Sequence, residues 1–185
     1  MEPWKRIQPT KVTKVGWRTI VTKTFQKPDG TTAVFDTMMP EGQQFVDVIA
    51  ITKDNRAILI REFQTGPERI SKGAPGGFVE GDESPLMAAQ RELLEETGYQ
   101  ASQMRLLGSH CKDAYLNGTW NVVLATGCSK VAEQQLDGEE AQIEVAEVTI
   151  SEFIAAAKAG EMTDTASVFL ALDELQKLEN AGDGK

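Results

Sequence analysis

The sequence predicts an α/β domain with an additional N-terminal β-hairpin. The chain has 185 residues, of which 41% are hydrophobic and 25% charged, so it can bury a core and is too apolar to be disordered. β-Branched runs dominate its first third, whereas helical spacing of apolar residues occurs after residue 84 and again near the C-terminus. Together these patterns favour a domain that combines β-strands with α-helices.

Charge and composition argue against several classes of partner. The 19 Lys and Arg residues against 28 Asp and Glu residues give a net charge of −9. Nonspecific binders of nucleic acid or of anionic membranes need clustered basic residues, so we expect neither activity. Two cysteines are too few for a disulfide framework, and the N-terminus lacks the apolar core of a signal peptide. We therefore expect a soluble, cytoplasmic protein.

Four β-rich runs in the N-terminal third are expected to pair as two hairpins. Each pair is joined by a segment rich in turn-forming residues such as Pro, Asp, Asn and Gly. The first hairpin comprises 11–25 and 31–36 with a turn at 27–30, and the second comprises 45–51 and 56–64 with a turn at 52–55.

A glycine-rich segment and a helix follow. The segment 73–77 contains three glycines and a proline, so we expect neither a regular helix nor a central strand there, but a loop whose backbone can approach a ligand. Ser84 has the properties of a helix N-cap, a proline follows it, and Gly98 is suited to end the helix. These signals predict a helix over 85–97.

The remaining chain is predicted to alternate short strands with helices. A polar stretch separates the second and third of these strands, and small polar residues form the tail. The predicted strands are 105–109, 121–125 and 142–150, the polar stretch is 133–140, the helices are 151–159 and 164–178, and the tail is 179–185.

Three carboxylates gather on the predicted helix. Glu92, Glu95 and Glu96 have i, i+3 and i+4 spacing, so about one helical turn brings them together. Arg91 can pair with one of them, but the others have no cationic neighbour in sequence. Hard divalent cations such as Mg²⁺ or Mn²⁺ bind oxygen ligands of this kind, often together with substrate phosphates. The alternative is an ordinary solvated helix face.

The spacing between the glycine segment and the helix carries a family resemblance. Gly77 is followed after five residues by Glu83, and after seven more by Arg91-Glu92-Leu93, with Glu95-Glu96 and Gly98-Tyr99 completing the pattern. This pattern resembles the signature of the Nudix hydrolases at every defined position. The resemblance implies an α/β/α sandwich with a mixed sheet, and hydrolysis of a nucleoside diphosphate linked to another moiety.

The resemblance also implies roles for individual residues of the signature. Glu92 and Glu96 would be the main ligands of Mg²⁺ or Mn²⁺, with the backbone carbonyl of Gly76 as a further ligand. Glu95 would be an additional ligand with a part in catalysis, or a partner of Arg91. Metal ions would neutralise the diphosphate and activate a water molecule for in-line attack.

Residues around these ligands are expected to orient the helix and to complete catalysis. Glu83 would orient the metal-binding helix through hydrogen bonds, and Arg91 would offset part of its charge. A base for the attacking water should lie outside the helix, and related sugar-nucleotide hydrolases place a glutamate in a loop near Glu139 and Glu140. Glu144 is a third candidate. A solvated acidic loop without function is the alternative for each.

The regions outside the signature are similar to the ADP-ribose and nucleoside-diphosphate-sugar pyrophosphatases. In that branch the N-terminal strands exchange contacts across a homodimer and help to form the substrate site. The similarity implies a dimerising β extension over 1–40, a hydrolase domain over 41–180 and a flexible tail over 181–185. A homodimer that acts on ADP-ribose and related nucleotide sugars is therefore expected.

Four residues are candidates for substrate contacts. Arg61 and Arg69 are the nearest cations that could hold a phosphate or a sugar, and Gln64 ends a strand that often ends in a basic residue in the related enzymes. Phe35 could stack on a base, or belong to a core or a dimer interface. Two other functions remain open: hydrolysis of oxidised nucleoside triphosphates, and catalytically silent sensing of ADP-ribose.

Overall fold

The computed structural model describes residues 1–136 and 142–182, and the chain forms two compact units. The first unit comprises Met1–Gln43 and Cys111–Thr119, and the second comprises Gln44–His110 and the chain from Trp120 onward. None of the described helices combines the length and the apolar character that a membrane span requires.

The first unit is built on a three-stranded antiparallel sheet in the order β1-β2-β3. The prediction of a single strand over 11–25 is wrong, because a turn at Gly16 divides this run. Gly16 has a φ of 59°, a conformation that glycine adopts without steric cost. The strands are β1 (Lys5–Val15), β2 (Arg18–Gln26) and β3 (Thr32–Met38).

The segment Cys111–Thr119 joins this unit through hydrogen bonds to the end of β3. The backbone N–H of Met38 donates to the carbonyl of Tyr115 at 2.8 Å, and the N–H of Asn117 donates to the carbonyl of Met38 at 2.9 Å. The Asn117 amide also donates to the Thr37 hydroxyl at 3.0 Å. The predicted ranges assign this segment to the hydrolase domain, and no local pattern indicates the long-range pairing.

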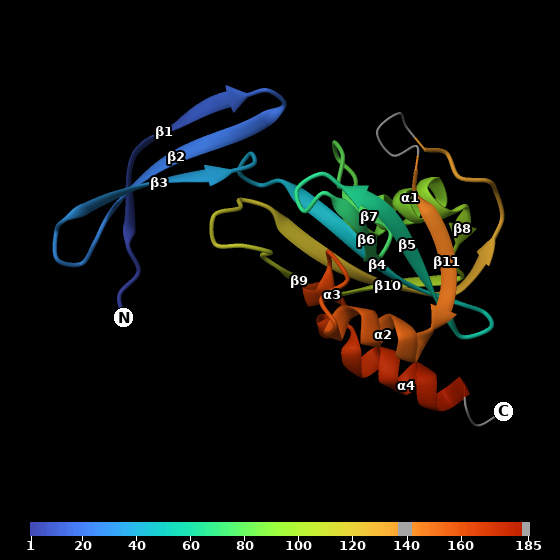
Figure 1. Cartoon of the computed structure of the whole chain (residues 1–185). Helices are drawn as coiled ribbons and strands as arrows, with labels where there is room; N and C mark the ends of the chain where they lie inside the picture. The colour runs from blue at the N-terminus through green and yellow to red at the C-terminus, as the bar shows by residue number, and fades with distance from the viewer. Residues whose placement is uncertain (137–141, 183–185) are drawn as a thin grey trace. The chain divides into compact units, whose positions relative to one another are not determined.

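The second unit is an eight-stranded sheet with helices on both faces. Helix α1 covers one face, and α2, α3 and α4 cover the other (Figure 1), so the predicted α/β/α sandwich is confirmed. The strands are β4 (Gln44–Thr52), β5 (Arg56–Gln64), β6 (Arg69–Gly73), β7 (Gly76–Phe78), β8 (Tyr99–Gln100), β9 (Gln103–His110), β10 (Thr119–Lys130) and β11 (Glu144–Thr149). The helices are α1 (Pro85–Thr97), α2 (Ile150–Lys158), α3 (Thr165–Leu170) and α4 (Leu172–Gly182).

Strand β4 supplies both cores because its side chains alternate between the two faces of the sheet. Val46 and Val48 pack in the cluster that contains Leu93 of α1. Ile49 packs in the cluster that contains Phe153 of α2. Full burial of an aliphatic or aromatic side chain stabilises the fold by about 1.5–3 kcal/mol. The packing of α1 on the sheet therefore fixes the position of the acidic residues on this helix.

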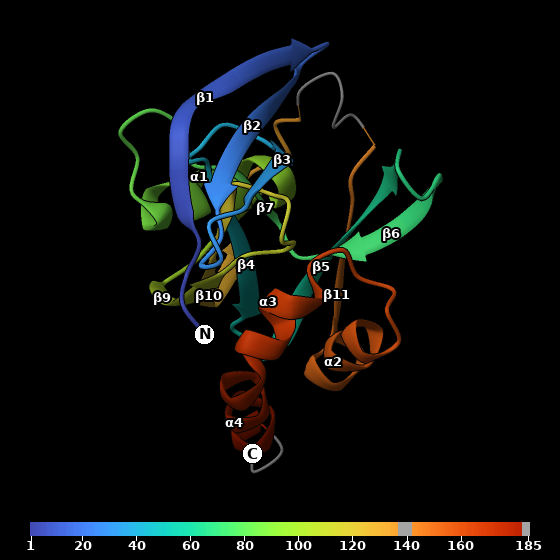
Figure 2. The ribbon, with the colours of Figure 1, turned by 90° about the vertical axis from the view of Figure 1, so that its left-hand side faces the viewer.

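The predicted hairpin of β4 and β5 is confirmed, and β5 also pairs with two further strands of the sheet. Along Arg56–Arg61, β5 pairs with β11, and along Ile60–Gln64 it pairs with β6. Figure 2 shows β6 and β11 beside β5. This arrangement places the predicted substrate residues of β5 and β6 on one hairpin.

The predicted bounds and caps of α1 are confirmed. The Ser84 hydroxyl accepts a hydrogen bond from the backbone N–H of Met87 at 3.3 Å. At the other end Gly98 has a φ of 75°, and its N–H donates to the carbonyl of Leu94 at 2.8 Å. A Cβ atom at Gly98 would lie 2.1 Å from the carbonyl oxygen of Ala132, so glycine is required for space as well as for conformation.

The prediction of one helix over 164–178 is wrong. The chain forms α3 and α4, which are separated at Ala171, where φ and ψ are −89° and −1°. Val168 and Leu175 are buried on the two helices, whereas Phe169 is 46% exposed. The sequence contains neither glycine nor proline at the break, so local signals could not predict it.

Candidate active site

The glycine segment lies directly on strand β4. Gly76 and Gly77 belong to the short strand β7, where they pair with Asp47 and Val46. The prediction excludes a regular helix and a central strand here, and β7 is a short strand that lies off the main strand order and pairs with β4. A Cβ atom on Gly76 would lie 2.1 Å from the carbonyl oxygen of Val46, so only glycine permits this close pairing.

Two of the three helix carboxylates face this glycine strand. Glu92 and Glu96 are 7% and 5% exposed, which shows that they do not form a solvated helix face. Oε2 of Glu96 accepts a hydrogen bond from the backbone N–H of Gly76 at 2.8 Å. A Cβ atom on Gly77 would lie 2.3 Å from Oε1 of Glu92, so the second glycine makes room for that carboxylate.

Arg91, in the middle of α1, contacts several of the acidic groups of the site. Its guanidinium donates to Glu83, Glu92 and Glu95, with N···O distances of 2.9 to 3.1 Å. It also donates to the backbone carbonyl of Phe78 in β7 at 2.9 Å. The structure thus brings the signature residues together, and Glu95 is a partner of Arg91, as one of the two predicted roles requires.

The electrostatics of this group leave an excess of negative charge. The guanidinium of Arg91 holds the pKa of Glu83 below its ordinary value, chiefly through their hydrogen bonds. The same hydrogen bonds raise the pKa of Arg91, so this side chain stays charged. The guanidinium of Arg91 contacts three glutamates, Glu83, Glu92 and Glu95, and Glu96 lies on the same helix beside the N–H of Gly76. Binding of a divalent cation would reduce this imbalance.

The oxygen donors fit a metal that also binds substrate. Within the residues described, no three Asp, Glu, His or Cys side chains converge as a complete metal-binding cage. Mg²⁺ is usually held by one or two carboxylates and completes its coordination with water and substrate phosphates. The two buried carboxylates of Glu92 and Glu96, beside the two glycines of β7, match this requirement.

The predicted substrate residues of the second unit are placed on β5 and β6. Arg61 forms an ion pair with Glu144 of β11 at 3.2 Å, and both side chains are at least half exposed. Gln64 and Arg69 are direct partners across the β5–β6 hairpin. Gln64 also donates a hydrogen bond to Glu62. Glu144 is therefore engaged with Arg61 and lies on a strand.

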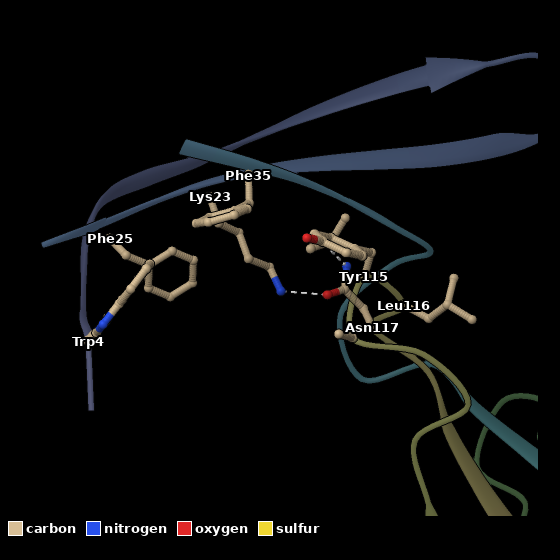
Figure 3. Close-up of a pocket in the computed structure, with 9 residues that line it drawn as sticks. Trp4, Lys23, Phe25, Phe35, Tyr115, Leu116 and Asn117 are labelled. Carbon is tan, nitrogen blue, oxygen red and sulfur yellow. Dashed lines mark hydrogen bonds between the residues drawn. The ribbon is translucent and has the colours of Figure 1, made fainter. Parts of the chain in front are cut away.

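Phe35 lines an aromatic pocket within the first unit. The pocket has a volume of about 510 Å³ (Figure 3). The ring centroids of Trp4, Phe25 and Tyr115 each lie 6.1 to 6.4 Å from that of Phe35. Lys23 reaches into the same pocket and donates a hydrogen bond to the Asn117 side chain. The pocket thus combines flat apolar surfaces with polar groups.

The two predicted bases, Glu139 and Glu140, lie outside the described residues. The chain on both sides of them is fastened to α1 by Gln134, whose amide donates to the carbonyls of Glu96 and Ile143 at 2.6 and 3.0 Å. The sequence analysis did not single out Gln134. Nothing in the surrounding polar stretch distinguishes it, because its partners are distant in sequence.

Several known proteins are similar to this chain in sequence. The chain is 30% identical to an ADP-ribose pyrophosphatase of Bacillus subtilis (strain 168) over 135 residues, 72% of each protein. It is 29% identical to a methanol dehydrogenase activator of Bacillus methanolicus over 153 residues, 82% of this chain and 81% of the relative.

A solved structure described as an ADP compounds hydrolase shares the fold. It superposes with a TM-score of 0.75 at 22% identity, and the alignment covers 94% of this chain and 97% of that one. The family model of the NUDIX domain matches residues 43–172, which include the glycine strand, α1, α2 and α3. The chain belongs to the NUDIX domain family.

Proposed function

We propose that this protein hydrolyses the diphosphate bond of ADP-ribose and similar nucleoside diphosphate sugars in a metal-dependent reaction. The observation that carries the proposal is the placement of the buried carboxylates of Glu92 and Glu96 against the backbone of Gly76 and Gly77. The similarity to a protein named ADP-ribose pyrophosphatase supports the choice of substrate.

In this proposal Glu92 and Glu96 hold Mg²⁺ or Mn²⁺, with the Gly76 carbonyl as a backbone ligand. The position of the two buried carboxylates against the backbone of Gly76 and Gly77 supports them as ligands. Glu95 is more exposed and contributes a further oxygen at the outer side of the helix. Glu83 and Arg91 orient α1 relative to β7 through the hydrogen bonds of the guanidinium.

The reaction adds water across the phosphoanhydride bond. The water oxygen forms a bond to one phosphorus, the bond from that phosphorus to the bridging oxygen breaks, and the products are a nucleoside monophosphate and a sugar phosphate. When bound, the metal neutralises the diphosphate and lowers the pKa of a coordinated water. Glu139 or Glu140 is proposed to accept the proton of the attacking water. Gln134 supports this assignment because it ties the flanking chain to α1.

In this proposal each unit by itself offers residues for substrate contacts. Arg69 and Gln64 are neighbours at the β5–β6 hairpin and offer donors to a phosphate or to sugar hydroxyls, and Arg61 offers a second cation. The aromatic pocket around Phe35 is suited to a nucleobase, since bases stack on aromatic rings. A homodimer in the cytoplasm completes the proposal. The exposed apolar side chains of Val12, Val15 and Trp17 support association through the first unit.

Product analysis tests this function. The full chain is incubated with ADP-ribose, ADP-glucose, GDP-mannose, UDP-glucose and ATP, with Mg²⁺ or with a chelator, and the products are separated by ion-exchange chromatography. The proposal predicts AMP and ribose phosphate from ADP-ribose, only when metal is present. Release of pyrophosphate from ATP alone would identify a nucleoside triphosphate hydrolase. Tight binding of ADP-ribose without cleavage would identify a sensor.

A further inference from the structure

Asp164 uses its side chain away from its own helix. It occupies the N-cap position of α3, where an aspartate ordinarily accepts hydrogen bonds from the first turn. In the described part of the chain, its side chain makes no such capping bond. The residue is 3% exposed, and its Oδ2 accepts a hydrogen bond from the backbone N–H of Ala74 at 2.5 Å. The carboxylate therefore binds the segment that leads into β7.

That segment has few backbone groups through which it can be held. Ala74 and Pro75 are the two residues between β6 and β7. Proline has no N–H, so Ala74 provides the one backbone donor of this connection. The carbonyl of Pro75 accepts a hydrogen bond from the N–H of Val48 at 2.8 Å. One side of the connection is thus fixed by β4 and the other by Asp164.

The chain before Asp164 is itself fastened to β6. The N–H of Lys72 donates to the carbonyl of Glu161, and the N–H of Thr163 donates to the carbonyl of Lys72, both at 3.1 Å. A parallel bridge between Lys72 and Met162 results, and the connection from α2 to α3 runs beside β6 (Figure 2). Asp164 therefore has a defined position relative to the glycine strand.

The chain after Asp164 is fastened to β4. The N–H of Ser167 donates to the backbone carbonyl of Asp164 at 2.9 Å. The Ser167 hydroxyl donates to Oδ2 of Asp47 at 2.5 Å, and Asp47 is the residue of β4 that pairs with Gly76. The chain on the two sides of Asp164 is thus held by β6 and by β4.

We infer that Asp164 is a positioning residue for the metal site, through the Ala74 N–H that its carboxylate binds. It sets the path of the backbone into Gly76, the residue whose N–H meets Glu96 and whose carbonyl is the proposed ligand. The inference rests on the proposed function, because the metal site is part of that proposal. The hydrogen bond between Asp164 and the Ala74 N–H does not depend on it. Groups that orient metal ligands change metal affinity by about 10–100-fold when they are removed.

The test compares three variants of the full chain. Asp164→Ser keeps a residue suited to cap α3 but is too short to reach Ala74. Asp164→Asn keeps the length and an oxygen acceptor. Val168→Ala, on the same helix, removes buried methyl groups without touching the connection and serves as the control for lost stability. The readouts are the Mn²⁺ dissociation constant of the free protein, by electron paramagnetic resonance, and hydrogen exchange of the Ala74 amide, by NMR.

The expected result is a clear separation of the variants. Asp164→Ser raises the Mn²⁺ dissociation constant by about tenfold or more and accelerates exchange at Ala74, whereas Asp164→Asn stays within a few-fold of wild type. Activity of Asp164→Ser is recovered at high Mg²⁺, with the KM for ADP-ribose little changed. Unchanged Mn²⁺ binding in Asp164→Ser, or equal weakening in Val168→Ala, would overturn the inference. If the wild-type protein itself binds no Mn²⁺, the proposed function fails. Rapid hydrogen exchange of the Ala74 amide in the wild-type protein would in addition show that Asp164 does not hold this amide.

Discussion

Arg91 donates from Nε and Nη2 to the two carboxylate oxygens of Glu83, at 3.0 and 3.1 Å. This two-point contact fixes the plane of the guanidinium. The remaining nitrogen then points at Glu92 and Glu95, and a further contact reaches the carbonyl of Phe78. A single cation thereby sets the orientation of α1 relative to β7.

The Arg91–Glu83 contact predicts a specific pH dependence of stability. Because Arg91 lowers the pKa of Glu83 in the folded state, the stabilisation is complete above the ordinary glutamate value of about 4.3 and is lost as the pH falls through the lowered pKa. Urea unfolding of wild type and Glu83→Gln should therefore differ most at pH 6 and least at pH 3. A difference that does not vary with pH would contradict this account.

Gly77→Ala should disturb the metal site without breaking the sheet. The added Cβ would lie 2.3 Å from Oε1 of Glu92, so this carboxylate must move, and we expect Mn²⁺ affinity and turnover to fall by roughly tenfold or more. Gly66→Ala is the matched control, because a Cβ there meets nothing within 4 Å. Titration calorimetry with Mn²⁺ compares the two. Equal affinities would show that Glu92 is not a ligand.

Phe35→Ala should weaken nucleotide binding in the first unit. Removal of the ring deletes one wall of the aromatic pocket, and loss of one stacking contact raises the dissociation constant for AMP by roughly tenfold. The fluorescence of the protein's tryptophans, Trp4 of the pocket among them, reports the titration. Val34→Ala, on the same strand and 63% exposed, is the control. Identical titrations of both variants would assign Phe35 to structure alone.

The loop glutamates should act on the water rather than on the metal. Changing Glu139 and Glu140 together to Gln is expected to lower kcat by roughly 100-fold or more, with Mn²⁺ affinity nearly unchanged. Glu133→Gln is the control, since the Glu133 side chain is 92% exposed. Parallel loss of turnover and of metal affinity would place these glutamates among the metal ligands instead.

The parts of the fold that depend on local signals could be predicted from the sequence. Helix α1 begins and ends at the predicted residues because its caps, Ser84 and Gly98, form their hydrogen bonds with the adjacent turns of the helix. The break at Ala171 and the strand at Gly76 could not be predicted, because packing and pairing with distant segments produce both. The division of 11–25 by Gly16 had a local signal, a glycine within a β-rich run.

The residues of the site also divide into those with a local sequence signal and those placed by distant segments. The spacing of the signature predicted which residues gather, including Glu92, Glu96 and Arg91. It could not predict Asp164 or Gln134, because their partners, Ala74 and the carbonyl of Glu96, lie 90 and 38 residues away in sequence. A side chain that binds the backbone of a residue so far away in the sequence leaves no recognisable sequence motif.

The most direct test of the central claim is Glu96→Gln, assayed with ADP-ribose beside the Glu133→Gln control. The substitution removes one buried charge of the acidic site and keeps the shape of the side chain, so the circular dichroism spectrum should match that of wild type. Turnover should fall by roughly two orders of magnitude or more, and Mn²⁺ binding should weaken in parallel. Wild-type turnover and wild-type Mn²⁺ affinity in Glu96→Gln would contradict a metal-dependent hydrolase centred on α1.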